Sequence, residues 1–262
     1  MLTHPLENPD PNQNVQALPR HLAGPGVIDP RTAWAFPFEE GWLFAQADAG
    51  TAAAFSPCLR LQTTYDPQPD KPGKGTWNIN AHRTPFTESA WRITFDATTP
   101  VELLHDVHTE LLDLYLEVRY SDRDLLFTDK TAAHQVYAPL LTRGWWHDVK
   151  TDGTQTFLLP KGLGGVCHRY EDSAPNGVDW RAWGGFPDEP HWTARFSFGT
   201  PTMLVAAFST SLISTEPLQR IVKDVPTQTR SSLYVATPIG KQPNGTTPVA
   251  PPSPAPVSGH TR

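Results

Sequence analysis

The residues of this sequence that could do chemistry are histidines, cysteines, arginines and tryptophans. His105 and His108 lie three residues apart, with Glu102 one turn before His105, and two imidazoles at this spacing can bind one metal ion. His108, however, falls among the leucines of an apolar stripe, whereas His105 falls among acidic side chains. We therefore interpret both histidines as packing and capping residues, and we predict no metal site.

Neither cysteine has the surroundings of a reactive or metal-binding thiol. Cys58 and Cys167 are too few for a disulfide framework or a metal quartet. Cys167 precedes His168, but neighbouring residues of a strand point to opposite faces, which argues against a thiolate pair. The glycine-rich run at 161–165 lacks the Lys-Ser/Thr pair of a phosphate loop, and the sequence has no hydrolase, zinc-protease or dinucleotide motif. We therefore predict a protein that is not an enzyme and that uses no cofactor.

Tryptophans and arginines are the remaining signal. Tryptophan recurs at matched places in two halves of the chain, as Trp42 and Trp145, Trp77 and Trp180, and Trp91 and Trp192. Such residues fit a core, but on an open sheet they would stack nucleic-acid bases beside arginines that bind phosphates. Trp91 and Arg92 are adjacent and would point to opposite faces of a strand, which favours tryptophan inside and arginine outside. The candidate nucleic-acid-binding residues are Arg60, Arg92, Arg181, Arg195, Trp77 and Trp180.

The chain repeats itself with an offset of about a hundred residues. Gly-Trp at 41–42 recurs at 144–145, and Trp77 recurs as Trp180, in both cases 103 residues later. Trp91, Phe95 and Thr99-Pro100 recur 101 residues later, so a two-residue deletion in one loop accounts for the change. This period fits a small domain rather than a solenoid unit. We interpret the sequence as a tandem duplication, with copies at residues 19–118 and 119–220.

Each copy predicts a series of strands closed by a helix. Asp152-Gly153 lies between two extended runs, which is a hairpin signal, and Ala49-Gly50 is its counterpart. The expected strands lie at 42–45, 52–55, 59–65, 77–80 and 91–95, and at 145–149, 155–159, 166–170, 180–183 and 192–198. Thr99-Pro100 and Thr200-Pro201 then begin helices, each as a capping threonine and a proline at the first helical position. The fold class is α+β, with an antiparallel four- or five-stranded meander and a C-terminal helix (ββββα) in each copy.

A shorter helix is favoured before each Gly-Trp pair. Asp29-Pro30 forms an N-cap and N1 pair for the first of these helices. Asp129 can cap the second from Lys130 onward, although Pro139 would kink or shorten it.

Composition and charge exclude several classes of protein. The chain has 262 residues and a formal net charge of −6, so a blanket attraction to nucleic acid or anionic lipid is not supported. No apolar run approaches the ~18 residues of a membrane span, and the first residues lack the features of a signal peptide. We expect a cytoplasmic protein with a disordered N-terminal segment at 1–18 and a Pro-rich disordered tail at 221–262.

Residues 19–26 (Pro-Arg-His-Leu-Ala-Gly-Pro-Gly) resemble the opening motif of the SPDY domain, an actinobacterial domain of unknown function. Gly-Trp, Ser56-Pro57, Trp77, Trp91-x-x-x-Phe95 and Thr99-Pro100 follow in the order of that family, and the second copy keeps this order with Leu159-Pro160 in place of Ser-Pro. Cys58 and Leu59 stand where the family name would have Asp and Tyr. The resemblance covers residues 19–215. It implies a protein encoded on the plasmids or chromosomes of mycelial actinobacteria. It implies no biochemical activity.

Topology offers one further analogy. Two consecutive ββββα units are similar in plan to the Whirly proteins, and one unit to the transcription coactivator PC four, and both bind single-stranded DNA. The analogy rests on the fold alone. We expect a non-enzymatic protein that binds single-stranded or locally opened DNA through a sheet face or the groove between the repeats. The alternative is a protein-interaction or scaffold module, whose edge strands bind a partner or a second copy. Neither interpretation involves a membrane.

Overall fold

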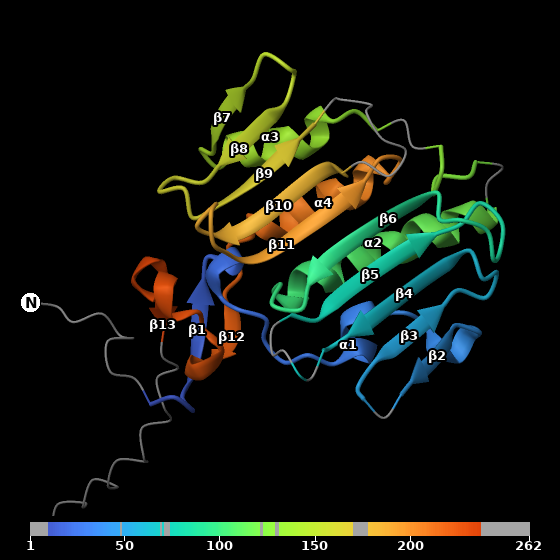
Figure 1. Ribbon diagram of the computed structural model, residues 1–262, viewed down its shortest axis with the longest axis horizontal. Helices are drawn as coiled ribbons and strands as arrows, with labels where there is room; N and C mark the ends of the chain where they lie inside the picture. The colour runs from blue at the N-terminus through green and yellow to red at the C-terminus, as the bar shows by residue number, and fades with distance from the viewer. Residues whose placement is uncertain are drawn as a thin grey trace, which may run out of the picture.

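The computed structural model describes residues 10–47, 49–68, 70, 74–120, 123–128, 131–169 and 178–236. Its main feature is a ten-stranded antiparallel sheet, with the strand order β2-β3-β4-β5-β6-β11-β10-β9-β8-β7 (Figure 1). The first half of the chain supplies β2 (Leu43–Gln46), β3 (Ala52–Phe55), β4 (Leu61–Asp66), β5 (Thr76–Ala81) and β6 (Trp91–Asp96). The second half supplies β7 (Trp146–Val149), β8 (Gln155–Leu158), β9 (Gly164–His168), β10 (Val178–Gly185) and β11 (Pro190–Ser197). The predicted α+β class is confirmed.

Each half is a five-stranded meander followed by one helix, so five strands rather than four precede each helix. The closing helices are α2 (Val101–Tyr120) and α4 (Thr202–Leu212), and shorter helices, α1 (Pro30–Trp34) and α3 (His134–Thr142), precede the meanders. The strands form where large apolar and polar residues alternate, as in Trp91–Asp96. Other strands, such as β3 with the sequence Ala-Ala-Ala-Phe, do not alternate and are predicted from the hairpin turns and the repeat.

The two meanders join strand to strand, which the sequence did not predict. β6 pairs with β11 through Ile93 and Phe196, Thr94 and Arg195, and Phe95 and Ala194. The backbone N–H of Arg92 also donates a hydrogen bond to Ser197 Oγ at 2.7 Å. The two repeats therefore share one continuous sheet.

The hydrophobic core lies between one face of this sheet and the helices. In Figure 1 the helices lie behind the strands, and α2 packs against α4, with α1 beside α2 and α3 beside α4. Phe95, Phe196 and Phe208 meet at the junction, with ring centroids 5.4–5.9 Å apart. One cluster of buried side chains runs through both halves. No described helix is both long and apolar enough to cross a membrane.

A second, three-stranded sheet corrects the predictions for the two ends of the chain. β1 (Asn14–Leu18) lies between β12 (Leu218–Ile221) and β13 (Tyr234–Ala236), with its own small core. Short 3-10 helices, η3 (Val222–Asp224) and η4 (Thr227–Ser232), separate the last two strands. Disorder is therefore wrong for residues 14–18 and 221–236. No local pattern indicates β1, because it pairs with strands about two hundred residues away. Residues 1–9 and 237–262 lie outside the described residues.

The helix-start predictions are partly confirmed. Asp29 caps α1 by accepting the Arg31 backbone N–H at 3.1 Å, and Pro30 is the first helical residue. Pro201, by contrast, occupies the N-cap of α4, and the Thr200 hydroxyl donates backwards to the Ser197 carbonyl at 2.7 Å. The predicted threonine cap is therefore wrong for this helix. Asp129 and Lys130 lie outside the described residues, and α3 begins at His134 with Pro139 inside it.

Candidate binding face of the sheet

The face of the ten-stranded sheet opposite the described helices is lined by polar side chains. Trp91, Ile93 and Phe95 of β6 are buried towards the helices, so Arg92 and Thr94 point to the other face. Directly paired residues of an antiparallel sheet share a face. The pairings therefore place seven side chains in one line across seven strands: Thr156, Cys167, Arg181, Arg195, Thr94, Asn78 and Thr64. We call this line the central row.

Three exposed arginines lie together in the middle of this face. Arg181 and Arg195 are directly opposite each other on β10 and β11. Arg92 lies on the next strand, two residues from the Thr94 that pairs with Arg195. Its Nε donates to Asn80 Oδ1 at 2.7 Å. Within the described residues, none of the three guanidinium groups forms an ion pair with a carboxylate. Like charges placed directly opposite repel each other, so the pair favours an external anion.

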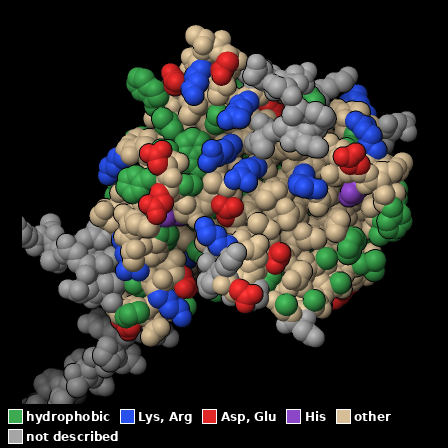
Figure 2. All heavy atoms as spheres, viewed as in Figure 1, with side chains coloured by type: hydrophobic (Ala, Val, Ile, Leu, Met, Phe, Trp, Pro, Cys, Tyr) green, Lys and Arg blue, Asp and Glu red, His purple; other side chains and the backbone are tan. Residues whose placement is uncertain are grey.

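Two hollows flank the arginines. One, of about 510 Å³, extends over β4, β5, β6 and β11, and its lining includes Gln62, Asn80, Arg92 and Arg195. The other, of about 340 Å³, is lined by Thr156, Cys167, Arg169, Asp179, Arg181, Trp183 and Arg195. Arg195 therefore belongs to both. Figure 2 views this face and shows Lys and Arg side chains across its middle, with some Asp and Glu side chains among them. Hydrophobic side chains lie towards β7 and β8 and also along the opposite edge at β2 and β3.

A second line of paired residues makes the β7 end of the face apolar. It runs from Trp146 through Leu158 and Gly165 to Trp183. Trp146 is 70% exposed, although the preceding Trp145 is buried. Trp146 and Trp183 are not among the candidate residues predicted from the sequence. The doublet Trp145-Trp146 was the available signal, because alternation along a strand must place one of two adjacent tryptophans on each face.

The structure corrects two of the six candidate residues. Trp77 and Trp180 are only 1% and 2% exposed and lie on the helix side of the sheet. Trp77 stacks on Tyr65 and Trp180 on His168, at centroid distances of 4.1 and 3.8 Å. They are core residues, and no base can reach their faces. At both Trp91-Arg92 and Trp180-Arg181, the tryptophan therefore points into the core and the arginine points to the open face.

Arg60 also lies apart from the other three arginines. Its guanidinium pairs with Asp124 at 2.5 Å and donates to the His82 carbonyl at 3.3 Å. The same guanidinium lies over the ring of Phe127, 4.9 Å from its centroid. These contacts use its charge within the protein. Arg92, Arg181 and Arg195 are thus the candidates that the fold brings together.

Among the described residues, Cys167 and the neighbouring His168 lie on opposite faces of the sheet. Cys167 lines the smaller hollow, whereas His168 lies on the helix side beside Trp180. His105 Nδ1 lies 3.0 Å from the Thr32 carbonyl. His108 Nδ1 donates to the Leu104 carbonyl at 2.7 Å, so its Nε2 accepts from the Thr63 hydroxyl at 3.2 Å. Burial lowers the pKa of His108 to about 4, so it is neutral at pH 7.

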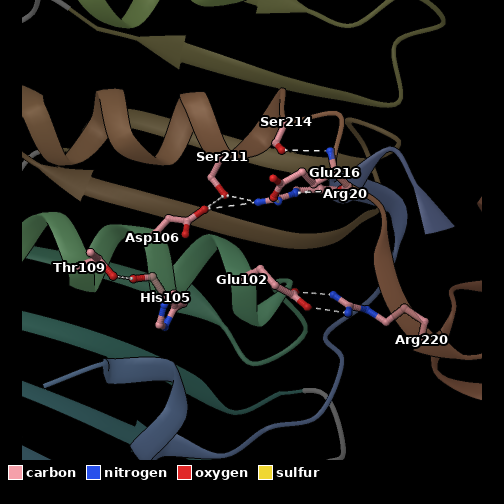
Figure 3. Close-up of polar contacts among 9 residues, drawn as sticks. All are labelled: Arg20, Glu102, His105, Asp106, Thr109, Ser211, Ser214, Glu216 and Arg220. Atoms are coloured by element: carbon pink, nitrogen blue, oxygen red, sulfur yellow. Dashed lines mark hydrogen bonds and ion pairs between the residues drawn. The ribbon is translucent and has the colours of Figure 1, made fainter. Parts of the chain in front are cut away.

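The opening motif at 19–26 ties the closing helices together. Arg20, at the start of the 3-10 helix η1 (Arg20–Leu22), donates to Ser211 Oγ of α4 at 3.0 Å and to Asp106 Oδ2 of α2 at 3.4 Å (Figure 3). It also pairs with Glu216 at 3.1 Å. Trp192 Nε1 donates to the His21 carbonyl at 2.9 Å. The motif therefore has a structural role at the junction of the repeats.

A second arginine fixes the small sheet to α2. Arg220 of β12 makes two hydrogen bonds to the carboxylate of Glu102, at 2.5 and 2.7 Å, and donates to the Gly24 carbonyl at 3.1 Å. Figure 3 shows Glu102 and Arg220 facing each other between the helix and the strand. The Arg220 side chain is only 1% exposed. Two parallel hydrogen bonds between a guanidinium and a carboxylate fix the orientation of the two groups and also stabilise their contact.

Comparison with known families agrees with the internal repeat. Residues 55–116 and 160–218 match the family model SPDY, described as Domain of unknown function (DUF317). The two matches fall one in each half, each ending in or just after the closing helix of its meander. No curated protein and no solved structure matches the chain. Residues 55–116 and 160–218 are thus two tandem copies of the SPDY domain.

Proposed function

We propose that this protein binds single-stranded or locally opened DNA on the open face of its ten-stranded sheet. The observation that carries the proposal is the directly opposed pair Arg181 and Arg195, with Arg92 on the next strand. Three exposed cations with no carboxylate partner among the described residues form a local anion site on a chain of net charge −6. Binding of phosphates would relieve the repulsion between them and release counterions.

The neighbours of the arginines support a phosphate ligand. Asn78, Asn80 and Gln62 present amide groups on the same face, and Thr64 and Thr94 present hydroxyls. Such side chains donate to phosphate oxygens and fix the position of a backbone without reading its sequence. The plan of the Whirly proteins and of the coactivator PC four supports the proposal by analogy only.

We further propose that the protein acts by binding rather than by catalysis. Catalysis by acyl or phosphoryl transfer needs a nucleophile, a base within hydrogen-bond reach and an orienting group. On the open face the Thr156 hydroxyl lies 3.9 Å from the thiol of Cys167. That pair contains no base.

The test is a titration of labelled single-stranded oligonucleotide followed by anisotropy. We expect the Arg92→Ala, Arg181→Ala, Arg195→Ala triple variant to bind at least roughly tenfold more weakly. Its dependence on salt should be shallower, by about 0.7 in log–log slope for each phosphate that is no longer neutralised. The matched control replaces Arg31, Arg143 and Lys223, which are exposed residues elsewhere, by alanine. It has the same net charge. Equal binding by the two triple variants would show that net charge, and not this face, controls affinity.

A second candidate function is binding of a protein partner at a sheet edge. β2 and β7 are the terminal strands of the sheet, and each carries an exposed apolar residue, Leu43 or Trp146. An unpaired edge can accept another strand. The same titration separates the candidates, because edge pairing does not need the central arginines and gives no salt-dependent oligonucleotide binding.

A further inference from the structure

The two halves of the open face are chemically different although they share one fold. In the first half, one line of paired residues runs Leu43, Phe55, Gln62, Asn80 and Arg92. The equivalent line of the second half runs Trp146, Leu158, Gly165, Trp183 and Thr193. Polar groups of the first copy are thus replaced by glycine and tryptophan in the second.

We infer that the second half carries a base-stacking site at Trp146 on the terminal strand β7. Trp183 lies three strands away on the same face, in the hollow that contains Arg181 and Arg195. The ligand class would be a single strand with unpaired bases. This inference rests on the proposed function. It adds that the bases of the bound strand, and not only its phosphates, contact the protein.

The absence of a side chain at Gly165 leaves room for the indole ring of Trp183. A Cβ atom on Gly165 would lie 2.4 Å from Trp183 Cζ2 and 3.0 Å from Leu158 Cδ2. Only glycine leaves room for the Trp183 ring at this point. Trp183 is 8% exposed and is one of the residues that line the hollow containing Arg181 and Arg195. The Arg181 guanidinium lies over the ring of Trp183, 6.0 Å from its centroid.

Within the described part of the protein, the Trp146 side chain is left largely uncovered and the indole N–H of Trp183 has no acceptor. Trp146 is 70% exposed on the terminal strand, which is unusual for the side chain with the largest apolar surface. The Nε1 of Trp183 is buried and has no acceptor among the described residues. A stacked base would cover Trp146, and the polar edge of a ligand in the adjacent hollow would lie close to Trp183.

The spacing suits a short single strand. Adjacent strands lie about 4.8 Å apart and each residue rises about 3.3 Å along a strand. Arg181 is three strands from Trp146 and two residues out of line with it, so the two residues are roughly 16 Å apart. A strand crossing this distance can place phosphates on the central arginines and a base on Trp146. A duplex hides its bases inside the stack, so it would use the arginines alone.

The experiment compares a single-stranded oligonucleotide of about 15 nucleotides with an abasic phosphodiester strand of the same length, using the full chain. The variants are Trp146→Ala and its matched control Leu43→Ala, which changes the equivalent exposed residue of the first copy. We expect the wild type to bind the oligonucleotide roughly tenfold more tightly than the abasic strand. Trp146→Ala should remove most of this difference, whereas Leu43→Ala should preserve it.

The other outcomes separate the stacking site from the proposed function. Equal affinity for the two strands, unchanged by Trp146→Ala, would overturn the stacking site and leave the proposed function standing. No binding of either strand would remove both. If Trp146→Ala changed only the sedimentation coefficient, Trp146 would belong to an interface between copies, and the stacking site would again be wrong. Thermal unfolding of both variants checks that these exposed substitutions leave the fold intact.

Discussion

At the scale of single residues, two histidines are held neutral inside the protein. His108 packs under the first meander, with Phe36 edge-on at 5.5 Å, and burial lowers its pKa to about 4. His21 lies at the junction of the repeats, and burial, assisted by nearby His191, lowers its pKa to about 3. Both imidazoles bind a proton more readily in the unfolded chain, where their pKa is near 6.5.

The free energy of unfolding depends on pH, because the folded and unfolded states bind different numbers of protons. The free energy of unfolding should be highest above pH 6.5 and should fall as the pH drops towards 4, because only the unfolded state takes up these protons. Each histidine contributes a slope approaching about 1.4 kcal/mol per pH unit. We expect His108→Gln to remove about half of the histidine slope between pH 6.5 and 5. Urea denaturation at several pH values measures this slope, and a slope identical to that of the wild type would contradict the burial of a neutral His108.

At the scale of elements, the ion pair between Arg220 and Glu102 connects β12 to α2. Arg220 is buried, so loss of its counter-charge leaves a cation without full compensation. We expect Glu102→Gln to lower the free energy of unfolding by at least ~2 kcal/mol. Glu117→Gln makes the same change at an exposed position of the same helix and should cost less than about 0.5 kcal/mol. Equal effects of the two variants in denaturant titrations would refute the role of the pair.

The elements also show what the sequence could predict. The ten strands of the meanders and the two long helices follow from local alternation and helical spacing, and the internal repeat supports each assignment. The pairing of β6 with β11 and the small sheet around β1 depend on contacts between segments far apart in the sequence, which alternation does not encode. The same distinction holds at the site. The position of Arg92 beside Trp91 predicts an exposed arginine, but the proximity of Arg181 to Arg195 depends on register.

At the scale of the whole molecule, the two copies share one hydrophobic core. The core cluster extends through both halves, and Phe95 of the first copy meets Phe196 and Phe208 of the second. An isolated copy would expose to water the core side chains that it buries against the other copy. We therefore expect a single calorimetric unfolding transition for the full chain, with equal calorimetric and van't Hoff enthalpies. Two resolved transitions would contradict the shared core.

The duplication also explains how an acidic protein can carry a cationic site. The fold is repeated, but the open-face residues are not: Thr94 and Arg195 occupy matching positions of the two copies, as do Arg92 and Thr193. The arginines consequently lie on both sides of the β6–β11 junction, and the open-face tryptophans Trp146 and Trp183 both lie in the second copy. The binding site that we propose is therefore one site at the junction of the copies, and not one site in each copy.

The most direct test of binding on this face uses the two cysteines of the wild-type protein. Cys167 lies in the central row, opposite Arg181, whereas Cys58 is exposed in the turn between β3 and β4. A saturating single-stranded oligonucleotide should slow the alkylation of Cys167 and leave that of Cys58 unchanged, and added salt should restore the Cys167 rate. Mass spectrometry of the two peptides over time measures both rates in one sample. A Cys167 rate that is the same with and without oligonucleotide would contradict binding on the open face.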